Sequence, residues 1–493
     1  MSRAKRIMVQ GTMSGAGKSL LCTALCRIFR QDGLRAAPFK SQNMALNSYV
    51  TLQLGEIGRA QAVQAEAAGI EPDVRMNPIL LKPSSDVGSQ VIVNGRVRGQ
   101  MAAADYFAYK KQLIPEILAA YESLAEEYDV IVIEGAGSPA EINLRENDIV
   151  NMGLAELVDA PVLLAGDIDR GGVFAQLYGT VLLLDKRERA RVRGLVINKF
   201  RGDEALLRPG LRQLESLTGV PVLGVVPLLP VRIDDEDSLA PCLAERTARK
   251  PIDIAVIRLP HIANFTDFSP LEAHPLLGVR YVSDAKDLGA PDLLILPGTK
   301  NTVDDLLWLR QSGLESAVLR LSAAGTPVFG ICGGYQMLGG MITDTAGLEG
   351  SCPSLRGMGL LPCETAFEAE KTLTRVRAVV TGGPLDGAAL EGYEIHMGTT
   401  AVRGEPFCRL EDGRAEGCRS GNVFGSYLHG LFDSGELTEK LAGWLCDRRG
   451  MEKKTAAAEP WRESKARRYD LLAAGVREAL DMDAIYRMME EYA

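Results

Sequence analysis

A glycine-rich loop near the start of the chain limits its possible folds more than any other feature. Residues 11–19, Gly-Thr-Met-Ser-Gly-Ala-Gly-Lys-Ser, follow a short apolar run that predicts a strand and precede a run with helical periodicity. A phosphate-binding loop requires this order of strand, glycines, Lys-Ser and helix, although the spacing is one residue longer than GxxxxGK[ST]. We therefore expect an α/β domain whose first strand ends at a nucleotide site.

Each part of this loop has an expected role in binding ATP. The backbone amides of residues 15–19, which include Gly15 and Gly17, face the phosphate oxygens at a helix N-terminus. Lys18 reaches the β and γ oxygens, and the Ser19 hydroxyl ligates Mg²⁺. Glu134, which ends the apolar run 131–133, is the expected second Mg²⁺ ligand, with an ordinary strand-end carboxylate as the alternative.

Two further polar residues are weaker candidates for the nucleotide site. Asn198 follows a predicted strand and is a candidate for adenine recognition, and Lys40 is a candidate for a phosphate contact. The alternative for both is a solvated surface position.

Short apolar runs alternate with helical patterns over most of the chain, which predicts two α/β units with parallel sheets. A polar, acidic stretch interrupts this alternation near residues 234–250. We expect a P-loop, carboxylate-activating domain over residues 1–233, a linker over 234–250, a second α/β domain over 251–440 and a C-terminal helical tail over 441–493. The tail has apolar residues at helical spacing, so it should pack on the body of the protein.

A lone cysteine stands between glycines in the second unit. Gly330-Ile331-Cys332-Gly333-Gly334 follows the buried-strand run 326–329. A sharp strand-to-helix turn lifts such a side chain above the sheet, and the first helical amides, beginning with that of Gly333, can hold an oxyanion. Taken alone, a buried cysteine in a glycine-rich turn is an equal alternative.

A thiolate that attacks an amide carbon needs a base or proton shuttle, and the chain has four histidines. His429 is the strongest candidate because it ends a predicted strand, 424–428, and precedes Gly430. A structural histidine is the alternative.

The amino-acid composition limits the classes of molecule that this chain is expected to bind. The net charge is −9 and no basic tract stands out, which argues against a general nucleic-acid binder. No apolar run reaches a membrane span and no signal peptide is evident, so we expect a cytoplasmic protein without a membrane partner. The nine cysteines are scattered, as expected for reduced thiols.

Several runs resemble the cobyric acid synthase family, in which a dethiobiotin synthetase-like P-loop domain is fused to a class I-type glutamine amidotransferase domain. The runs are 40–48, 76–83, 88–93, 134–144 and 167–174. The resemblance covers nearly the whole chain. It implies ATP- and glutamine-dependent amidation of the b, d, e and g carboxylates of adenosylcobyrinic acid a,c-diamide, a corrinoid, in cobalamin biosynthesis.

The resemblance also implies roles in the second domain. Cys332 and His429 would form the pair that hydrolyses glutamine, and the Gly298 N–H would be the second oxyanion donor. The acidic partner usual two residues after the histidine is absent, since position 431 is leucine, which leaves open what orients His429. His396, in the matching run 393–398, is interpreted as a substrate-side or structural residue.

Two chemistries on one chain favour an amide-forming enzyme, because ammonia attacks a carboxylate only after activation and must arrive unprotonated. Gln42, Asn43 and Asn47 are candidates for recognising the acceptor's existing amides. The alternatives are cobyrinic acid a,c-diamide synthase, which has the same architecture, and a partitioning-type P-loop ATPase. The sequence leaves open whether the chain forms a homo-oligomer.

Overall fold

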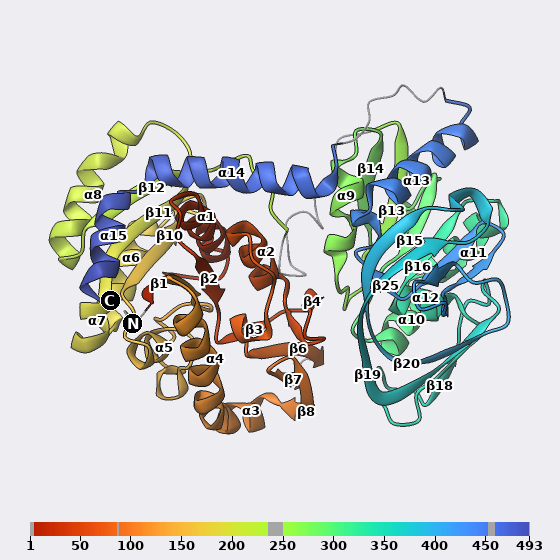
Figure 1. Ribbon diagram of the computed structural model, residues 1–493, viewed down its shortest axis with the longest axis horizontal. Coiled ribbons are helices and arrows are strands. Elements are labelled where there is room, and N and C mark those ends of the chain that lie inside the picture. Colours follow the sequence, from red (N-terminus) through yellow and green to blue (C-terminus); the bar gives the residue numbers. More distant parts are fainter. Residues whose placement is uncertain (1–3, 86–87, 235–249, 452–458, 493) are drawn as a thin grey trace.

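The computed structural model describes residues 4–85, 88–234, 250–451 and 459–492 and contains two α/β lobes spanned by one long helix (Figure 1). Apart from its two end residues, the expected linker 234–250 lies outside the described residues. The two lobes confirm the α/β fold class with parallel sheets. Among the described residues no helix is both long and apolar enough to cross a membrane.

The first lobe is built on a six-stranded parallel sheet in the order β12-β11-β10-β1-β9-β2. Its central strand β1 is buried on both faces, as expected for a parallel sheet covered by helices. The strands are β1 (Lys5–Gly11), β2 (Ala36–Phe39), β9 (Val130–Glu134), β10 (Val162–Asp167), β11 (Val192–Phe200) and β12 (Val222–Pro227).

Helices cover both faces of this sheet and enclose two apolar cores. One core includes α1 (Lys18–Gln31) together with α14 (Trp461–Ala479) and α15 (Met482–Glu491) from the end of the chain. The remaining helices of the lobe are α2 (Arg59–Ala68), α3 (Ala103–Tyr109), α4 (Ile114–Glu127), α5 (Met152–Leu157), α6 (Val173–Leu183), α7 (Lys186–Arg191) and α8 (Glu204–Thr218).

Two small sheets extend this lobe toward the second one (Figure 1). One has the order β3-β6-β7-β8 and the other pairs β4 with β5. Their strands are β3 (Gln42–Met44), β4 (Ser48–Val50), β5 (Glu56–Gly58), β6 (Ile79–Ser85), β7 (Gly88–Val93) and β8 (Arg96–Ala102).

The second lobe has a six-stranded sheet in the order β14-β13-β15-β16-β24-β23, parallel except for the β23 edge. The strands are β13 (Ile252–Ile257), β14 (Leu277–Val282), β15 (Leu293–Leu296), β16 (Val328–Ile331), β23 (Cys418–Ser420) and β24 (Val423–Ser426). The helices are α9 (Ser269–Ala273), α10 (Thr302–Gln311), α11 (Leu314–Ala323), α12 (Gly333–Leu338) and α13 (Gly435–Arg448).

A mostly antiparallel sheet lies beside it in the same lobe and contains the longest strands of the structure. Its members are β17 (Met341–Thr343), β18 (Ser354–Arg356), β19 (Cys363–Val380), β20 (Ala389–Val402), β21 (Cys408–Leu410), β22 (Ala415–Glu416) and β25 (Leu428–His429). The expected start of the tail, residue 441, falls inside α13, which packs in the second lobe. The chain then returns through α14 and α15 to the first lobe.

Candidate active site

Cys332 stands at a sharp turn between β16 and α12. Its φ is +52°, a conformation that costs a non-glycine residue free energy and is typical of a nucleophile elbow. The Cys332 N–H donates to the Ser426 carbonyl at 2.8 Å, which ties the turn to β24. At Gly334 a Cβ would lie 2.1 Å from the Leu296 carbonyl oxygen, so only glycine lets the turn approach the end of β15 this closely.

His429 ends β25 beside this turn and is paired with a carboxylate. Its Nδ1 lies 2.7 Å from Asp267 Oδ2, and the Gly430 N–H donates to Asp267 Oδ1 at 2.9 Å. Burial opposes the imidazolium, but the charge and hydrogen bond of Asp267 outweigh it and raise the pKa of His429 to about 10. The pair therefore favours a protonated His429.

Asp267 orients His429, and no sequence pattern near His429 predicts this partner. It lies in the one-turn helix η5 (Phe265–Phe268), 162 residues before its partner. The position two residues after the histidine, where such an acid is usual, holds Leu431. Only a search for acidic residues after strand β13 could have suggested Asp267.

The two expected oxyanion donors flank the same space. A Cβ at Gly298 would lie 3.0 Å from His429 Cε1 and 3.7 Å from Cys332 Cβ, so Gly298 lies between these side chains. Gly333 is the first residue of α12, directly after Cys332. These positions bring together Cys332, His429, Gly298 and Gly333, as a thioester-forming site requires.

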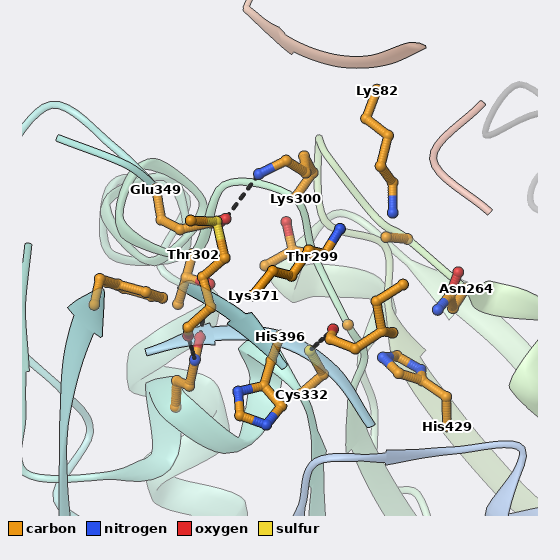
Figure 2. Close-up of a pocket in the computed structure, with 16 residues that line it drawn as sticks. Lys82, Asn264, Thr299, Lys300, Thr302, Cys332, Glu349, Lys371, His396 and His429 are labelled. Carbon is orange, nitrogen blue, oxygen red and sulfur yellow. Dashed lines mark hydrogen bonds and ion pairs between the residues drawn. The ribbon is translucent and has the colours of Figure 1, made fainter. Parts of the chain in front are cut away.

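A pocket opens over these residues, and its wall includes residues of both lobes (Figure 2). His396 lines it and stacks on Tyr427, with ring centroids 3.6 Å apart. Burial lowers the pKa of His396 to about 4. A neutral, stacked imidazole suits the structural or substrate-side interpretation better than a proton shuttle.

The glycine-rich loop joins β1 to α1 in the first lobe. Gly15 and Gly17 have φ values of +76° and +94°, and a Cβ at Gly17 would lie 2.1 Å from Asn198 Nδ2. Lys18 Nζ donates to the carbonyls of Met13 and Gly137 at 3.1 and 3.0 Å, so it connects the glycine-rich loop to the segment after β9. This backbone fits the phosphate cradle expected from the sequence.

Glu134 lies beside the loop at the end of β9. It accepts hydrogen bonds from Ser19 Oγ at 2.8 Å and from Lys40 Nζ at 2.9 Å, and a further one from Gln64 Nε2. Burial opposes ionisation, but Lys40 and these hydrogen bonds lower the pKa of Glu134. A carboxylate and a hydroxyl side by side are oxygen donors that fit Mg²⁺.

The weaker nucleotide and acceptor candidates differ in their exposure to solvent. Asn198 Nδ2 donates to the Ala16 carbonyl at 2.9 Å, so its amide contacts the loop backbone. Asn43 and Asn47 are buried, and Asn43 Nδ2 donates to Gln61 Oε1 at 2.9 Å. Gln42 is half-buried and accepts a hydrogen bond from Tyr106 at 2.5 Å. Of the three acceptor candidates, Gln42 is the most accessible.

Comparison with known proteins matches a separate domain family to each lobe. Residues 7–237 match the CobQ/CobB/MinD/ParA nucleotide binding domain, and residues 253–437 match the CobB/CobQ-like glutamine amidotransferase domain. The chain is 53% identical to the cobyric acid synthase of Lachnoclostridium phytofermentans over 99% of both chains. It is 55% identical to that of Ruminiclostridium cellulolyticum and 52% identical to that of Salmonella agona, each over 99% of this chain and 98% of the relative.

Proposed function

This chain belongs to the cobyric acid synthase family of glutamine-hydrolysing amide ligases in cobalamin biosynthesis, and we propose that it converts adenosylcobyrinic acid a,c-diamide to adenosylcobyric acid. The b, d, e and g carboxylates of the corrinoid become amides, with ATP and glutamine as the other substrates. The observation that carries the proposal is one chain with both a phosphate-type loop and the Cys332, His429 and Asp267 cluster.

In the second lobe, Cys332 attacks the side-chain amide carbon of glutamine. Cys332 attacks as the thiolate, with the proton already on His429, and His429 gives that proton to the departing ammonia while Asp267 stabilises the imidazolium until the transfer. The amides of Gly298 and Gly333 are our candidates for holding the oxyanion. Water then cleaves the thioester to glutamate and restores the thiol.

In the first lobe, a corrinoid carboxylate takes the γ-phosphoryl group of ATP and releases ADP. Ammonia attacks the acyl phosphate, phosphate leaves, and an amide forms. Lys18 and the amides of residues 15–19 would hold the phosphates, and Ser19 with Glu134 would hold Mg²⁺, which supplies charge neutralisation at the phosphate oxygens. Of Gln42, Asn43 and Asn47, which we propose contact the acceptor, Gln42 is the most exposed to solvent.

The division of labour is tested with Cys332→Ala and two nitrogen sources. We expect this variant to lose synthesis from glutamine and to retain synthesis from added ammonia, because the thiol supplies nitrogen and does not activate the acceptor. Each precursor is incubated with ATP, and products are identified by mass. Loss of both activities in a folded variant would contradict the proposal.

The same assay tests the acceptor. Prolonged turnover of the a,c-diamide should give the tetra-amidated product, while cobyrinic acid without its a and c amides should react poorly. Efficient conversion of that acid to the a,c-diamide, without further amidation, would instead favour the a,c-diamide synthase activity.

A further inference from the structure

Three lysines project into the wall of the Cys332 pocket (Figure 2). Lys82 comes from β6 of the first lobe, whereas Lys300 and Lys371 come from the second, from the segment after β15 and from β19. Their side chains are 6%, 7% and 9% exposed. Burial of an ammonium group is unfavourable unless an anion accompanies it, so each of these charges needs a partner.

Within the described residues, two carboxylates form ion pairs with these lysines. Glu56 Oε1 accepts from Lys82 Nζ at 2.6 Å, and Glu56 Oε2 accepts from Lys371 Nζ at 2.5 Å. Glu349 accepts from Lys300 Nζ at 2.7 Å. Three positive charges therefore meet two negative ones, and Lys82 and Lys371 share a single carboxylate.

The neighbouring His429–Asp267 pair leaves this excess in place. His429 and Asp267 form a pair of opposite charges when His429 is protonated, so together they add no net charge. Burial lowers the pKa of Lys371 to about 8, with Lys82 and Lys300 contributing in the same direction. An added anion would relieve the repulsion between these ammonium groups.

The substrate proposed for this pocket carries such an anion. Glutamine places its amide at one end, where Cys332 attacks, and its α-carboxylate at the other. Figure 2 shows the ammonium ends of Lys82 and Lys371 near one another, on the side of the pocket away from Cys332. An extended glutamine whose amide lies at the thiol would direct its α-carboxylate toward the lysines.

We propose that Lys82 and Lys371 together bind the α-carboxylate of glutamine, so that the first lobe supplies part of the glutaminase pocket. This inference rests on the proposed function, because it takes glutamine as the molecule that Cys332 attacks. It makes Lys82 a determinant of glutamine specificity, although it lies in the lobe that binds ATP. Glutamine would then bind well only while β6 lies against the second lobe.

A structural role is the rival explanation, since Glu56 and Lys371 also join the two lobes by an ion pair. The two roles differ in how they depend on the substrate. Loss of a binding contact impairs only substrates that carry the α-carboxylate, whereas a distorted pocket impairs every amide. The analogue 4-aminobutanamide keeps the amide and the amino group of glutamine and lacks the α-carboxylate.

The experiment compares wild type with Lys82→Met and Lys371→Met on both amides, with ATP and the corrinoid acceptor present. The released glutamate or 4-aminobutanoate is quantified by chromatography. We expect each variant to raise the KM for glutamine by roughly 10- to 100-fold, as for a lost charge-assisted hydrogen bond. The kinetics of 4-aminobutanamide should change less than about twofold. If that amide turns over too slowly, its inhibition constant against glutamine hydrolysis replaces KM.

Lys110→Met is the matched control, because Lys110 lies in the same lobe and stacks over Phe107, outside the pocket. The Lys110→Met variant should leave the kinetics with both amides unchanged. An unchanged KM for glutamine in Lys82→Met, or an equal loss with both amides in both pocket variants, would overturn the inference. Failure of the wild type to release glutamate would instead contradict the proposed function.

Discussion

The carboxylate of Asp267 sets the protonation and orientation of His429, because its two oxygens make two separate contacts with the histidine segment. One oxygen faces Nδ1 of the ring, and the other accepts the N–H of the next residue, Gly430. The first contact sets the tautomer and the second fixes the backbone that carries the ring. Asp267 thus acts on the reaction through His429, as a positioning residue.

Asp267→Asn should lower kcat for glutamine hydrolysis by about 100-fold or more, because the amide supports the wrong ring tautomer and no longer stabilises the imidazolium. Synthesis from added ammonia should be unaffected. Steady-state kinetics across pH should also show the profile shifted relative to wild type. The matched control is Glu439→Gln, which alters a second histidine–carboxylate pair in the same lobe, with His274. Full glutaminase activity in Asp267→Asn would exclude this role.

The raised pKa of His429 also predicts a pH dependence of stability. The folded value is about 10 and the ordinary value is 6.5, so the pair's stabilisation is fully present below pH 6.5 and is lost as pH rises through 10. The difference in free energy of unfolding between wild type and Asp267→Asn should therefore shrink from pH 6.5 to pH 10. Denaturant melts at several pH values measure it, and a constant difference would contradict the assigned pair.

Cys332 and His429 were predictable because each lies in a local pattern, a glycine-flanked turn or a strand end. Asp267 was not, since its relation to His429 exists only after β13 and β25 are brought together in the fold. Lys82 escaped prediction for the same reason. It belongs by sequence to one domain and by position to the pocket of the other.

At the scale of elements, both candidate sites use a strand that ends in a tight turn and a helix that begins there. The glycines serve different purposes in the two turns. In the first lobe, Gly15 and Gly17 adopt positive φ in the loop that we propose binds phosphate. In the second, Gly334 permits the backbone of α12 to contact the end of β15, and the strained residue is Cys332 itself.

Gly334→Ala should therefore disable the elbow, since the new Cβ would meet the Leu296 carbonyl at 2.1 Å and the helix would have to move. We expect at least about 2 kcal/mol of destabilisation and loss of glutamine hydrolysis. Gly435→Ala is the control, because a Cβ at this position would have no atom within 4 Å and the residue starts a helix in the same lobe. Equal stability of the two variants in thermal melts would argue against the tight approach.

Lys18→Ala should abolish synthesis from both glutamine and ammonia, because the phosphate contact serves the step that the two routes share. Lys186→Ala, at an exposed position of α7, should have no effect. ADP release measured with each nitrogen source distinguishes the outcomes. Turnover with ammonia at the wild-type rate would remove the glycine-rich loop from the mechanism.

At the scale of the whole molecule, the two ends of the chain meet in one lobe. Lys5 in β1 forms an ion pair with Glu490 in α15 at 3.1 Å, and Figure 1 shows the termini close together. The second lobe is therefore inserted between β12 and α14. The amphipathic pattern of the tail predicted a packed helix, but a pattern cannot say which core it completes, so this return to the first lobe was not predictable.

A pair of adjacent leucines in α14 tests that packing. Leu472 is fully buried in the core with α1, whereas Leu471 is 54% exposed. Leu472→Ala should destabilise the nucleotide lobe by about 2–5 kcal/mol, and Leu471→Ala should change stability by less than about 0.5 kcal/mol. Unfolding followed with and without ATP identifies the affected lobe. Similar losses of stability in the two variants would show that α14 does not pack against this core through Leu472.

The inserted second lobe also bears on how the protein is made. The ribosome makes β1 and α1 before the strands of the second lobe, and α14 and α15 after them. During synthesis, the apolar surface that will meet Leu472 and Met489 stays without its native cover until α14 and α15 have been made. The second lobe is complete once α13 has been made, so it can fold before the first lobe has all of its helices. We therefore expect the first lobe to finish folding after the second, although its synthesis begins earlier.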